Sequence, residues 1–342
     1  MPTASPRRGP SMADVAREAG VSGQTVSRVA NGKTNVDDAT RDRVLAAMRR
    51  IGYRPNSAAR ALRNGKFRSI GVIISALPTF GNSRTLDAIA AAVVAQGFSI
   101  ILMPVTRPTQ GEVTGAFSKL NEQAVDGVII LIEQHQLDES EIELPRGLPV
   151  VVIDSNARYE YPVVDTDQAE GAASATRHLL DLGHQTVWHI AGPPQSYAAE
   201  RRQRSWQATL EQAGRDVPPV LTGDWSAESG YQHGLRLADD PTVTAVFTAN
   251  DQMALGLLRA LHERGRLVPD DVSVVGFDDM EEAAYFWPPL TTVKQSFAEV
   301  GRRAVDALIR EIQSGEHEHQ EVLVPTELVV RASTAPPPGT IA

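Results

Sequence analysis

From Ser69 onward, short runs of β-branched residues alternate with helical patterns, and this alternation restricts the fold more than any other feature of the sequence. The expected strands cover residues 69–75, 98–105, 127–132, 149–154, 186–191, 220–223, 243–248, 272–277 and 321–330. The expected helices cover residues 83–96, 109–123, 167–182, 197–213, 227–238, 251–264 and 297–314. Repeated strand–helix–strand units of this kind build doubly wound parallel sheets with helices on both faces.

About ten strands are too many for one compact sheet in a chain of this length, so we expect two such subdomains. The core, residues 69–333, is expected to divide into one subdomain of residues 69–165 and 294–324 and a second of residues 166–293 and 325–333, followed by a loose tail over residues 334–342. In folds of this class a ligand binds at the carboxyl ends of the strands, which here lie between the subdomains.

The stretch Ser11–Asn31 has the pattern of two short helices joined by a tight turn. Ser11 and Ser22 are suited to cap the two helices, and Gly20 stands where the chain must reverse. A packing helix would not combine several exposed polar groups with Arg28, so an ordinary helical hairpin is the weaker interpretation. The stretch therefore predicts a helix-turn-helix whose second helix enters the major groove of DNA.

A third helix is expected over residues 38–52, where the apolar residues Val44, Ala47, Met48 and Ile51 recur at helical spacing. This stripe closes a small three-helix core, so residues 11–55 form a DNA-binding headpiece behind a disordered arm of residues 1–10.

The segment 56–66 is helix-prone but isolated. It is capped by Asn56, ends at Gly65 and has one large apolar residue, Leu62. About two turns are too few to hold helicity alone, so we expect a conditional helix that forms when something packs against it. A plain interdomain linker is the alternative.

Charge is distributed unevenly along the chain. Residues 1–68 contain 14 Lys and Arg against 5 Asp and Glu, a net of +9, whereas the whole chain has a net charge of −9. A basic head on an acidic body is typical of a DNA-binding domain joined to a ligand-binding or oligomerising body.

Polar side chains that suit a polyhydroxylated ligand follow the expected strands. They are Ser75, Asp154, Arg202, Trp225, Asn250, Asp251, Asp278 and Asp279. Carboxylates and a guanidinium can share paired hydroxyl groups, and an indole can cover the apolar face of a sugar ring. Individual members also have structural interpretations: Asp278 as a turn residue, Asn250 as a helix cap and Trp225 as a core residue.

No feature of the sequence indicates an enzyme, a cofactor or a metal. The chain has no cysteine, and no nucleophile accompanies the adjacent pair Asp278 and Asp279. His317 and His319 lie in an acidic loop that is more typical of a solvated turn than of a metal site. Neither a G-x-G-x-x-G motif nor a P-loop is present, and no secretion signal or membrane-length apolar run is found, so we expect a cytoplasmic protein with no membrane partner.

Over residues 11–333 the sequence resembles the LacI/GalR family of bacterial transcriptional regulators. The resemblance rests on the headpiece residues 14–29 and on the segments GDWSA at 223–227, ANDQMALG at 249–256, SVVGFDD at 273–279 and PPLTTVKQ at 288–295. It implies a homodimeric repressor with a helix-turn-helix headpiece and a periplasmic-binding-protein-like core, which binds double-stranded operator DNA and is controlled by a small sugar, a galactoside.

The resemblance also implies site residues. It places the effector on Asp154, Arg202, Trp225, Asn250, Asp278, Gln295 and Phe297. It assigns base reading to Gly23, Gln24 and Arg28, and DNA-backbone contacts to Ser11, Ser22, Thr25, Ser27 and Asn31. It makes the segment 56–66 a hinge helix whose Leu62 enters the minor groove beside Asn56 and Ala59.

Three departures from the most similar members of the family matter. Gly23 stands where those members have a base-reading tyrosine, so we expect a different operator sequence. Ala198 stands where they have a serine near the sugar, which changes the fit of the ligand. The sequence stops at Ala342 without a leucine-heptad helix for tetramers, so we expect a dimer.

Other functions fit less well. A transport-type sugar-binding protein would need a secretion signal and would not need residues 11–64, and a sugar-active enzyme would need a catalytic pair. Within the family, the main alternative is a regulator that responds to another sugar or to a purine corepressor. Trp225 among several acidic side chains favours a neutral sugar, and the sequence leaves open whether the ligand releases or promotes DNA binding.

Overall fold

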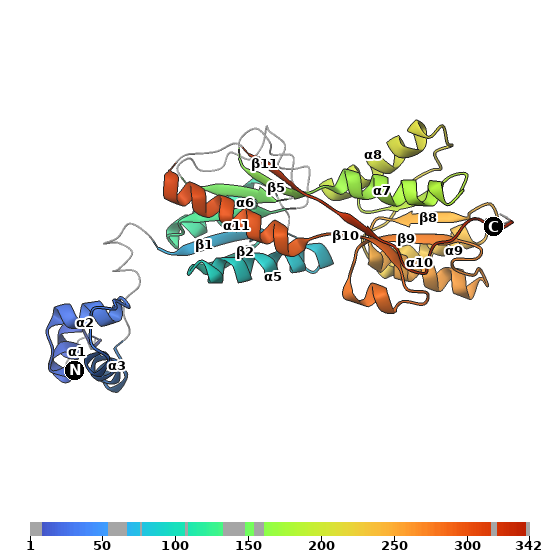
Figure 1. Cartoon of the computed structure of the whole chain (residues 1–342). Coiled ribbons are helices and arrows are strands. Elements are labelled where there is room, and N and C mark those ends of the chain that lie inside the picture. Colours follow the sequence, from blue (N-terminus) through green and yellow to red (C-terminus); the bar gives the residue numbers. More distant parts are fainter. Residues whose placement is uncertain are drawn as a thin grey trace, which may run out of the picture. The chain divides into compact units, whose positions relative to one another are not determined.

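The computed structural model describes residues 9–53, 67–75, 77–106, 109–132, 148–153, 161–315 and 320–339 (Figure 1). The chain forms two compact units, residues 1–67 and residues 68–342. In the described residues, no helix is both long enough and apolar enough to cross a membrane.

The first unit contains three helices, α1 (Met12–Ala19), α2 (Gly23–Ala30) and α3 (Asp38–Ile51). Each begins at a polar residue whose side chain accepts a backbone hydrogen bond from the first turn: Ser11, Ser22 and Asp37. Val15, Val26, Val29, Val44, Ala47 and Met48 are buried together and make a core for the unit. The predicted headpiece helices and the predicted apolar stripe are therefore confirmed.

Gly20 serves the turn through its backbone conformation. Its φ of +65° lies in the left-handed region, where residues with a side chain are strained. A Cβ built at this position would meet nothing within 4 Å, so the backbone conformation of the turn, and not a lack of space, favours glycine here.

The second unit contains two six-stranded sheets of the same strand order (Figure 1). Sheet A has the order β11-β5-β4-β3-β1-β2, with β1 (Ser69–Ile74), β2 (Ser99–Pro104), β3 (Gly127–Leu131), β4 (Val150–Ile153), β5 (Val163–Thr166) and β11 (Glu321–Val324). Sheet B has the order β12-β10-β9-β8-β6-β7, with β6 (Trp188–Ala191), β7 (Leu221–Thr222), β8 (Ala245–Thr248), β9 (Ser273–Asp278), β10 (Thr291–Lys294) and β12 (Glu327–Val329). Neighbouring strands are parallel except β10 and β12.

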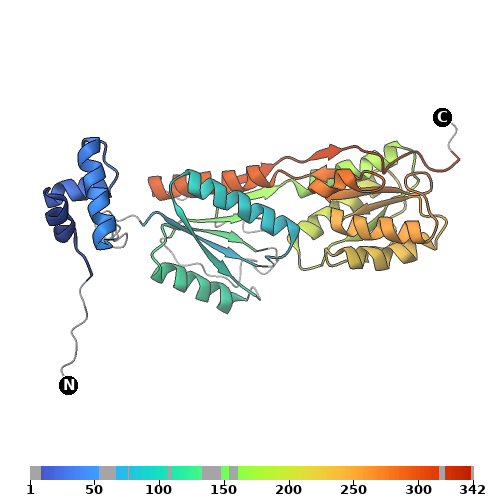
Figure 2. The same ribbon diagram turned by 90° about the horizontal axis from the view of Figure 1, so that it is seen from below.

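Helices cover both faces of each sheet, as doubly wound sheets require (Figure 2). Sheet A lies between the pair α5 (Phe80–Ala95) and α11 (Phe297–Ser314) on one face and α6 (Gln110–Glu122) on the other, and we call this assembly subdomain A. Sheet B lies between α9 (Ala227–Ala238) and α10 (Asp251–Glu263) on one face and α7 (Gln168–Asp181) and α8 (Tyr197–Gln212) on the other, and we call it subdomain B. The predicted pair of doubly wound subdomains is confirmed.

The chain crosses between the subdomains three times, from β5 to α7, from β10 to α11 and from β11 to β12. The single strand expected over residues 321–330 is therefore wrong, because it is two strands in different sheets. Pro325, which lacks a backbone N–H, lies at this break. The four-residue strands β5 and β10 and the 3-10 helix Glu281–Tyr285 were not predicted.

The start of the predicted loose tail is fixed in place. Ala335 accepts hydrogen bonds from Ser273 and donates one to the same hydroxyl, and Thr334 is hydrogen-bonded to His178. These contacts tie residues 334 and 335 to subdomain B, so the expectation of a loose tail from residue 334 is wrong there.

Candidate functional site

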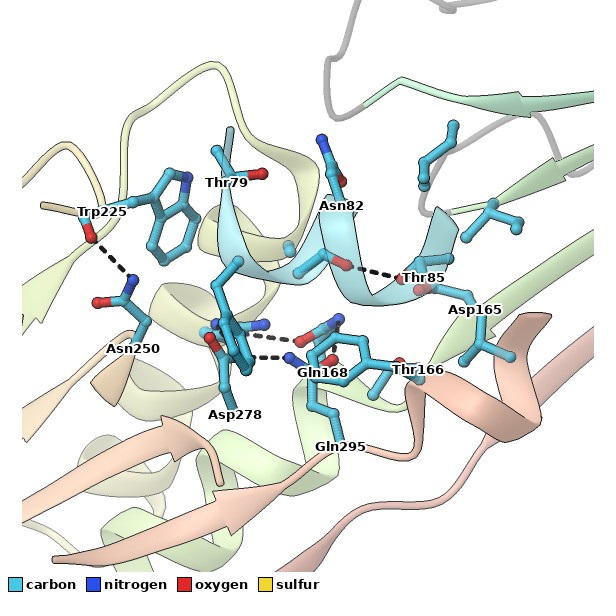
Figure 3. Close-up of a pocket in the computed structure, with 18 of the residues that line it drawn as sticks. Thr79, Asn82, Thr85, Asp165, Thr166, Gln168, Trp225, Asn250, Asp278 and Gln295 are labelled. Atoms are coloured by element: carbon cyan, nitrogen blue, oxygen red, sulfur yellow. Dashed lines mark hydrogen bonds and ion pairs between the residues drawn. The ribbon is translucent and has the colours of Figure 1, made fainter. Parts of the chain in front are cut away.

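A pocket of about 600 Å³, open to solvent, lies between the two subdomains (Figure 3). In each sheet the strand order reverses beside the first strand of that sheet, β1 or β6, and the lining residues follow the carboxyl ends of the strands around that point. Subdomain A and the crossover segments supply Thr79, Phe80, Gly81, Asn82, Thr85, Leu131, Ile153, Asp165, Thr166, Gln295, Phe297 and Val300. Subdomain B supplies Gln168, Ala198, Arg202, Trp225, Asn250, Gln252 and Asp278.

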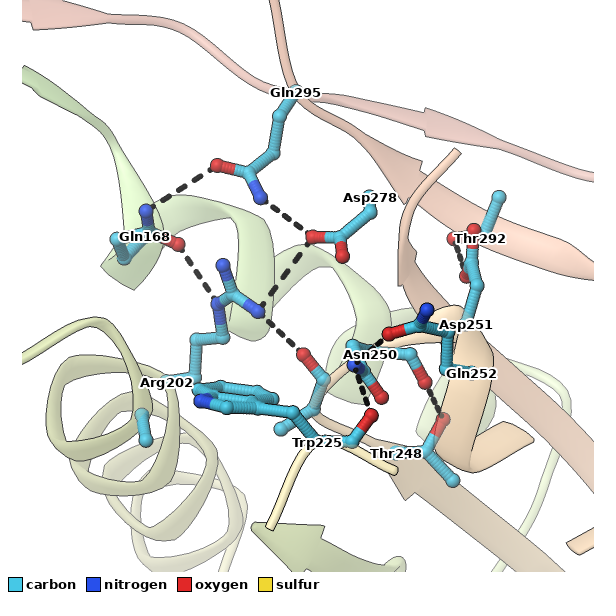
Figure 4. A network of polar contacts seen from close by, with 12 residues as sticks. Gln168, Arg202, Trp225, Thr248, Asn250, Asp251, Gln252, Asp278, Thr292 and Gln295 are labelled. Carbon is cyan, nitrogen blue, oxygen red and sulfur yellow. Dashed lines mark hydrogen bonds and ion pairs between the residues drawn. The ribbon is translucent and has the colours of Figure 1, made fainter. Parts of the chain in front are cut away.

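Arg202 is buried at the centre of a polar network (Figure 4). Its Nε donates to Oε1 of Gln168 at 2.8 Å, and one terminal nitrogen donates to the backbone carbonyl of Ala249. The guanidinium carbon lies 3.8 Å from the ring centroid of Phe277 and 5.5 Å from that of Trp225. A planar cation held by hydrogen bonds at its edge and by an aromatic ring at its face has one fixed orientation.

Asp278 lies opposite this cation. Its Oδ1 accepts a 2.6 Å hydrogen bond from Gln295 and lies 3.8 Å from Nη1 of Arg202. Gln295 in turn accepts a 3.3 Å hydrogen bond from Gln168, so Gln168, Arg202, Asp278 and Gln295 form a closed ring of contacts. Burial raises the pKa of Asp278 to about 6, although Arg202 and Gln295 both act in the opposite direction.

The turn that presents Asp278 is strained. Asp278 has a φ of +117° and Asp279 one of +52°, which is the region that favours glycine. Two contacts hold it: Asp251 accepts a 2.8 Å hydrogen bond from the backbone N–H of Met280, and Asp279 binds Arg331 at 2.6 Å. The two acids therefore face different partners, which rules against a paired acid–base function for them.

A second buried carboxylate supports the same turn. Asp251 accepts a 2.5 Å hydrogen bond from Thr292, and its pKa is raised well above the usual value by burial and then by the charge of Asp278. A side chain at Gly276 would collide with Asp251, because a Cβ there would lie 2.2 Å from its Oδ1. The sequence suggested Asp251 only as a candidate ligand group, whereas it acts as the support of the Asp278 turn.

Trp225 lines the pocket in another strained conformation, with a φ of +71°. Its carbonyl accepts a 3.0 Å hydrogen bond from Asn250, whose Oδ1 also caps α10 by accepting from the backbone of Met253. The helix-cap interpretation of Asn250 and its place in the pocket are thus both correct, and Trp225 both lines the pocket and packs against the core of subdomain B.

The start of α5 forms the facing wall. Its polar side chains Thr79, Asn82 and Thr85 line the pocket, and Asn82 donates a 2.8 Å hydrogen bond to the carbonyl of Ser75. Phe80 and Phe297 close one side, with their rings edge to face and their centroids 5.8 Å apart.

The structure brings together most of the predicted effector residues. Arg202, Trp225, Asn250, Asp278, Gln295 and Phe297 all line the pocket, as does Ala198. Ser75 lies at the end of β1 but is absent from the lining, and Asp154 is outside the described residues. Gln168 and the polar residues at the start of α5 were not predicted. The one signal for them in the sequence is that polar residues follow β1 and β5, and β5 itself was not predicted.

In the headpiece, α2 has one exposed polar face and one buried face. Ser22, Gly23, Gln24 and Arg28 are exposed, whereas Val26 and Val29 are buried against the rest of the unit. The hydroxyls of Ser11 and Ser22 cap helices, and Asn31 donates to Ser27 at the end of α2. Asn56, Ala59 and Leu62 lie outside the described residues, as do His317 and His319.

The lining offers binding groups rather than reactive ones. Within the described ranges, no cluster of three or more His, Asp or Glu side chains is arranged to hold a metal ion. The cation of Arg202, the carboxylate of Asp278 and the amides of Gln168 and Gln295 order one another, and such a set suits a neutral ligand with several hydroxyl groups.

Comparison with known proteins supports the division into a helix-turn-helix headpiece and a ligand-binding core. Residues 11–56 match the model of "Bacterial regulatory proteins, lacI family", and residues 176–334 match that of a periplasmic binding protein-like domain. The chain is 36% identical over 328 residues to the lactose operon repressor of Escherichia coli (strain K12), covering 95% of this chain and 90% of that protein. It is 32% identical to the repressor PurR of Haemophilus influenzae (strain PittEE), covering 94% and 97%. A crystal structure of the lac repressor dimer bound to operator and the anti-inducer ONPF has a TM-score of 0.86 at 34% identity, covering 96% of this chain and 100% of that one.

Proposed function

Because the chain belongs to the LacI family of bacterial regulatory proteins, we propose that it is a transcriptional repressor whose affinity for operator DNA is controlled by a small sugar. The observation that carries the proposal is that one pocket between the two subdomains is lined by Arg202, Trp225, Asn250, Asp278 and Gln295. A ligand that contacts both subdomains stabilises one relative arrangement of them, and it shifts the equilibrium only by its difference in affinity for the two arrangements.

DNA recognition is assigned to the headpiece. The exposed face of α2 presents Gln24 and Arg28 beside a position, Gly23, that has no side chain. Arginine and glutamine are the side chains that read guanine and adenine edges in the major groove. We assign the DNA-backbone contacts to Ser11, Ser22, Thr25, Ser27 and Asn31, and minor-groove contact to Leu62 with Asn56 and Ala59.

The ligand is proposed to be a neutral sugar, with a galactoside as the first candidate. The charged groups of the pocket are already matched: Arg202 lies beside Asp278, and Asp165 is paired with Arg201. A ligand with a net charge would leave one of these groups unbalanced in a buried site. Hydroxyl groups can both donate to Asp278 and accept from Gln295, and Trp225 offers an aromatic face for the ring.

A purine corepressor is the second candidate, because PurR proteins are among the relatives at 32% identity. Trp225 and Phe297 would then stack on a base, and Arg202 and Gln295 would bind its edge. The two candidates differ in which compound stabilises the protein.

We propose a homodimer as the functional form. Tyr285 and Trp287 are 84% and 93% exposed, although large aromatic side chains are normally buried. Both follow the Asp278 turn in the sequence, and Tyr285 is the last residue of the 3-10 helix Glu281–Tyr285. A second copy of the chain is the partner that we assign to this surface.

The test is a thermal-unfolding screen of the full chain with galactosides, glucosides, cellobiose, ribose and purine bases. A ligand at one hundred times its dissociation constant stabilises the folded state by about 2.7 kcal/mol. Stabilisation by a sugar that disappears in Arg202→Met supports the proposal. Stabilisation by a purine and by no sugar overturns the sugar assignment in favour of the second candidate.

A further inference from the structure

Asp165 and Arg201 form a buried ion pair that joins the two subdomains. Asp165 lies on β5 of sheet A, and Arg201 lies on α8 of subdomain B. Nη1 of Arg201 donates to Oδ2 of Asp165 at 2.9 Å, and the two side chains are only 17% and 2% exposed.

This contact differs from the other ion pairs of the second unit. Of the salt bridges between two described residues, it is the one that connects subdomain A to subdomain B. The others lie within α7, α8, α10 or α11, or within subdomain B.

The pair is adjacent to the pocket on both sides. Asp165 is itself a lining residue, and Arg201 is next in sequence to Arg202, the centre of the polar network. The ring of Tyr197, one turn earlier on α8, lies 5.5 Å from the guanidinium of Arg201 and restricts its position. Helix α8 thus presents Arg202 to the pocket and the preceding residue, Arg201, to the other subdomain.

We propose that the Asp165–Arg201 pair is a latch that holds the two subdomains in the arrangement of this structure and sets how readily they separate. The proposal rests on the proposed function for its biological meaning, because subdomain movement is how the ligand would act on DNA binding. With a latch in place, part of the preference for the arrangement of this structure is supplied by the protein before any ligand binds.

The physical basis is that each charge is tolerated in this buried site only because the other is present. Removing one partner leaves an uncompensated buried charge, which is strongly unfavourable. Separation of the subdomains returns that charge to water, so a single-partner variant shifts the equilibrium towards separated subdomains. A double variant without either charge has no such penalty and shifts less.

The experiment measures the distance between the subdomains in the absence of DNA and ligand. The chain has no cysteine, so Ser118→Cys on α6 and Gln232→Cys on α9 give two unique and exposed labelling positions. Labelled chains are mixed with an excess of unlabelled chains, and the distance distribution is recorded by pulsed electron paramagnetic resonance. The variants are Arg201→Met, Asp165→Asn and the double variant, with Arg204→Met as the control, since the exposed Arg204 on the same helix pairs with Glu200 one turn away.

We expect Arg201→Met and Asp165→Asn each to raise the population of longer distances by roughly tenfold or more, the double variant to raise it less, and Arg204→Met to leave it unchanged. Arg201→Lys keeps the charge and is expected to restore much of the original distribution. Identical distributions in Arg201→Met and the unmodified chain overturn the latch, as does an equal effect of Arg204→Met. If Arg201→Met does not unfold cooperatively, Arg201→Lys and Asp165→Asn are compared instead. The latch then requires a larger population of long distances in Asp165→Asn than in Arg201→Lys, and equal populations overturn it. Because neither DNA nor ligand is present, failure of the latch is distinguishable from failure of the repressor assignment.

Discussion

The indole of Trp225 lies so close to Gly192 that a Cβ at Gly192 would come within 2.4 Å of two ring carbons. The ring cannot retreat by a simple backbone adjustment, because Trp225 is fixed in the left-handed region and its carbonyl is bound by Asn250. The space into which the ring can move is the pocket. Gly192 therefore sets the position of the aromatic wall without contacting a ligand.

Gly192→Ala is expected to displace the ring into the pocket and to weaken ligand binding by about tenfold or more, at a cost of roughly 1–3 kcal/mol in stability. Binding is measured by calorimetry with the ligand found in the thermal screen, and stability by denaturant unfolding. Gly115→Ala is the matched control, because a Cβ there meets nothing within 4 Å. Unchanged affinity in Gly192→Ala would show that the position of Trp225 is unimportant.

Asp278 predicts a specific pH dependence of stability. Its pKa of about 6 in the folded protein lies above the ordinary value of 3.8, so the folded state binds the proton more tightly than the unfolded state. The contribution of this residue to stability is therefore largest below about pH 4 and is lost as the pH rises to about 6, by on the order of 3 kcal/mol. The buried Asp251 changes in the same direction, so the comparison must be with Asp278→Asn.

The measurement is the free energy of unfolding of both proteins at intervals from pH 4 to pH 7. The unmodified chain should lose more stability over this range than Asp278→Asn. Parallel curves for the two proteins would show that Asp278 does not titrate there.

Arg28→Ala is expected to lose discrimination at one guanine of the operator, because an arginine fork on the guanine edge contributes roughly 1–3 kcal/mol. Base preferences are compared by selecting bound sequences from a random DNA library with each protein. Arg17→Ala on α1, also exposed in the headpiece, is the control for loss of positive charge. If both variants keep the preferences of the unmodified chain, Arg28 does not read bases.

Trp287→Glu tests the proposed dimer surface. A charge at a residue that is 93% exposed in the single chain costs little in a monomer but is unfavourable in a desolvated interface. Sedimentation should therefore show a shift from dimer to monomer. Leu267→Glu, at another exposed apolar position, should sediment like the unmodified chain. A Trp287→Glu variant that remains dimeric places the interface elsewhere.

The sequence predicts the fold well where the signals are local. Ser11, Ser22 and Asp37 act as helix caps because capping depends on a few neighbouring residues. The long β-branched runs such as β1 and β3 are buried on both faces and are recognisable for that reason. The strands β5 and β10 have only four residues each and lie next to crossovers, so their local pattern is too short to mark them.

The pocket is predictable in part for the same reason. Polar residues at strand ends identified Arg202, Asp278 and Asn250, because a parallel sheet brings those ends together. The sequence could not show that Gln168 binds Arg202 or that Asp165 pairs with Arg201, since these contacts join residues 34 and 36 positions apart across two elements. Nor could it show that Asp251 supports a turn, which depends on the strained backbone of Asp278.

Occupation of this pocket is proposed to control DNA binding. The direct test is the operator affinity of the unmodified chain and of Arg202→Met, each measured with and without the ligand that stabilises the protein. We expect the ligand to change the operator affinity of the unmodified chain by about fivefold or more. We expect Arg202→Met to bind the operator normally but to respond no longer. A ligand that binds the unmodified chain and leaves its operator affinity unchanged would show that the pocket does not control DNA binding.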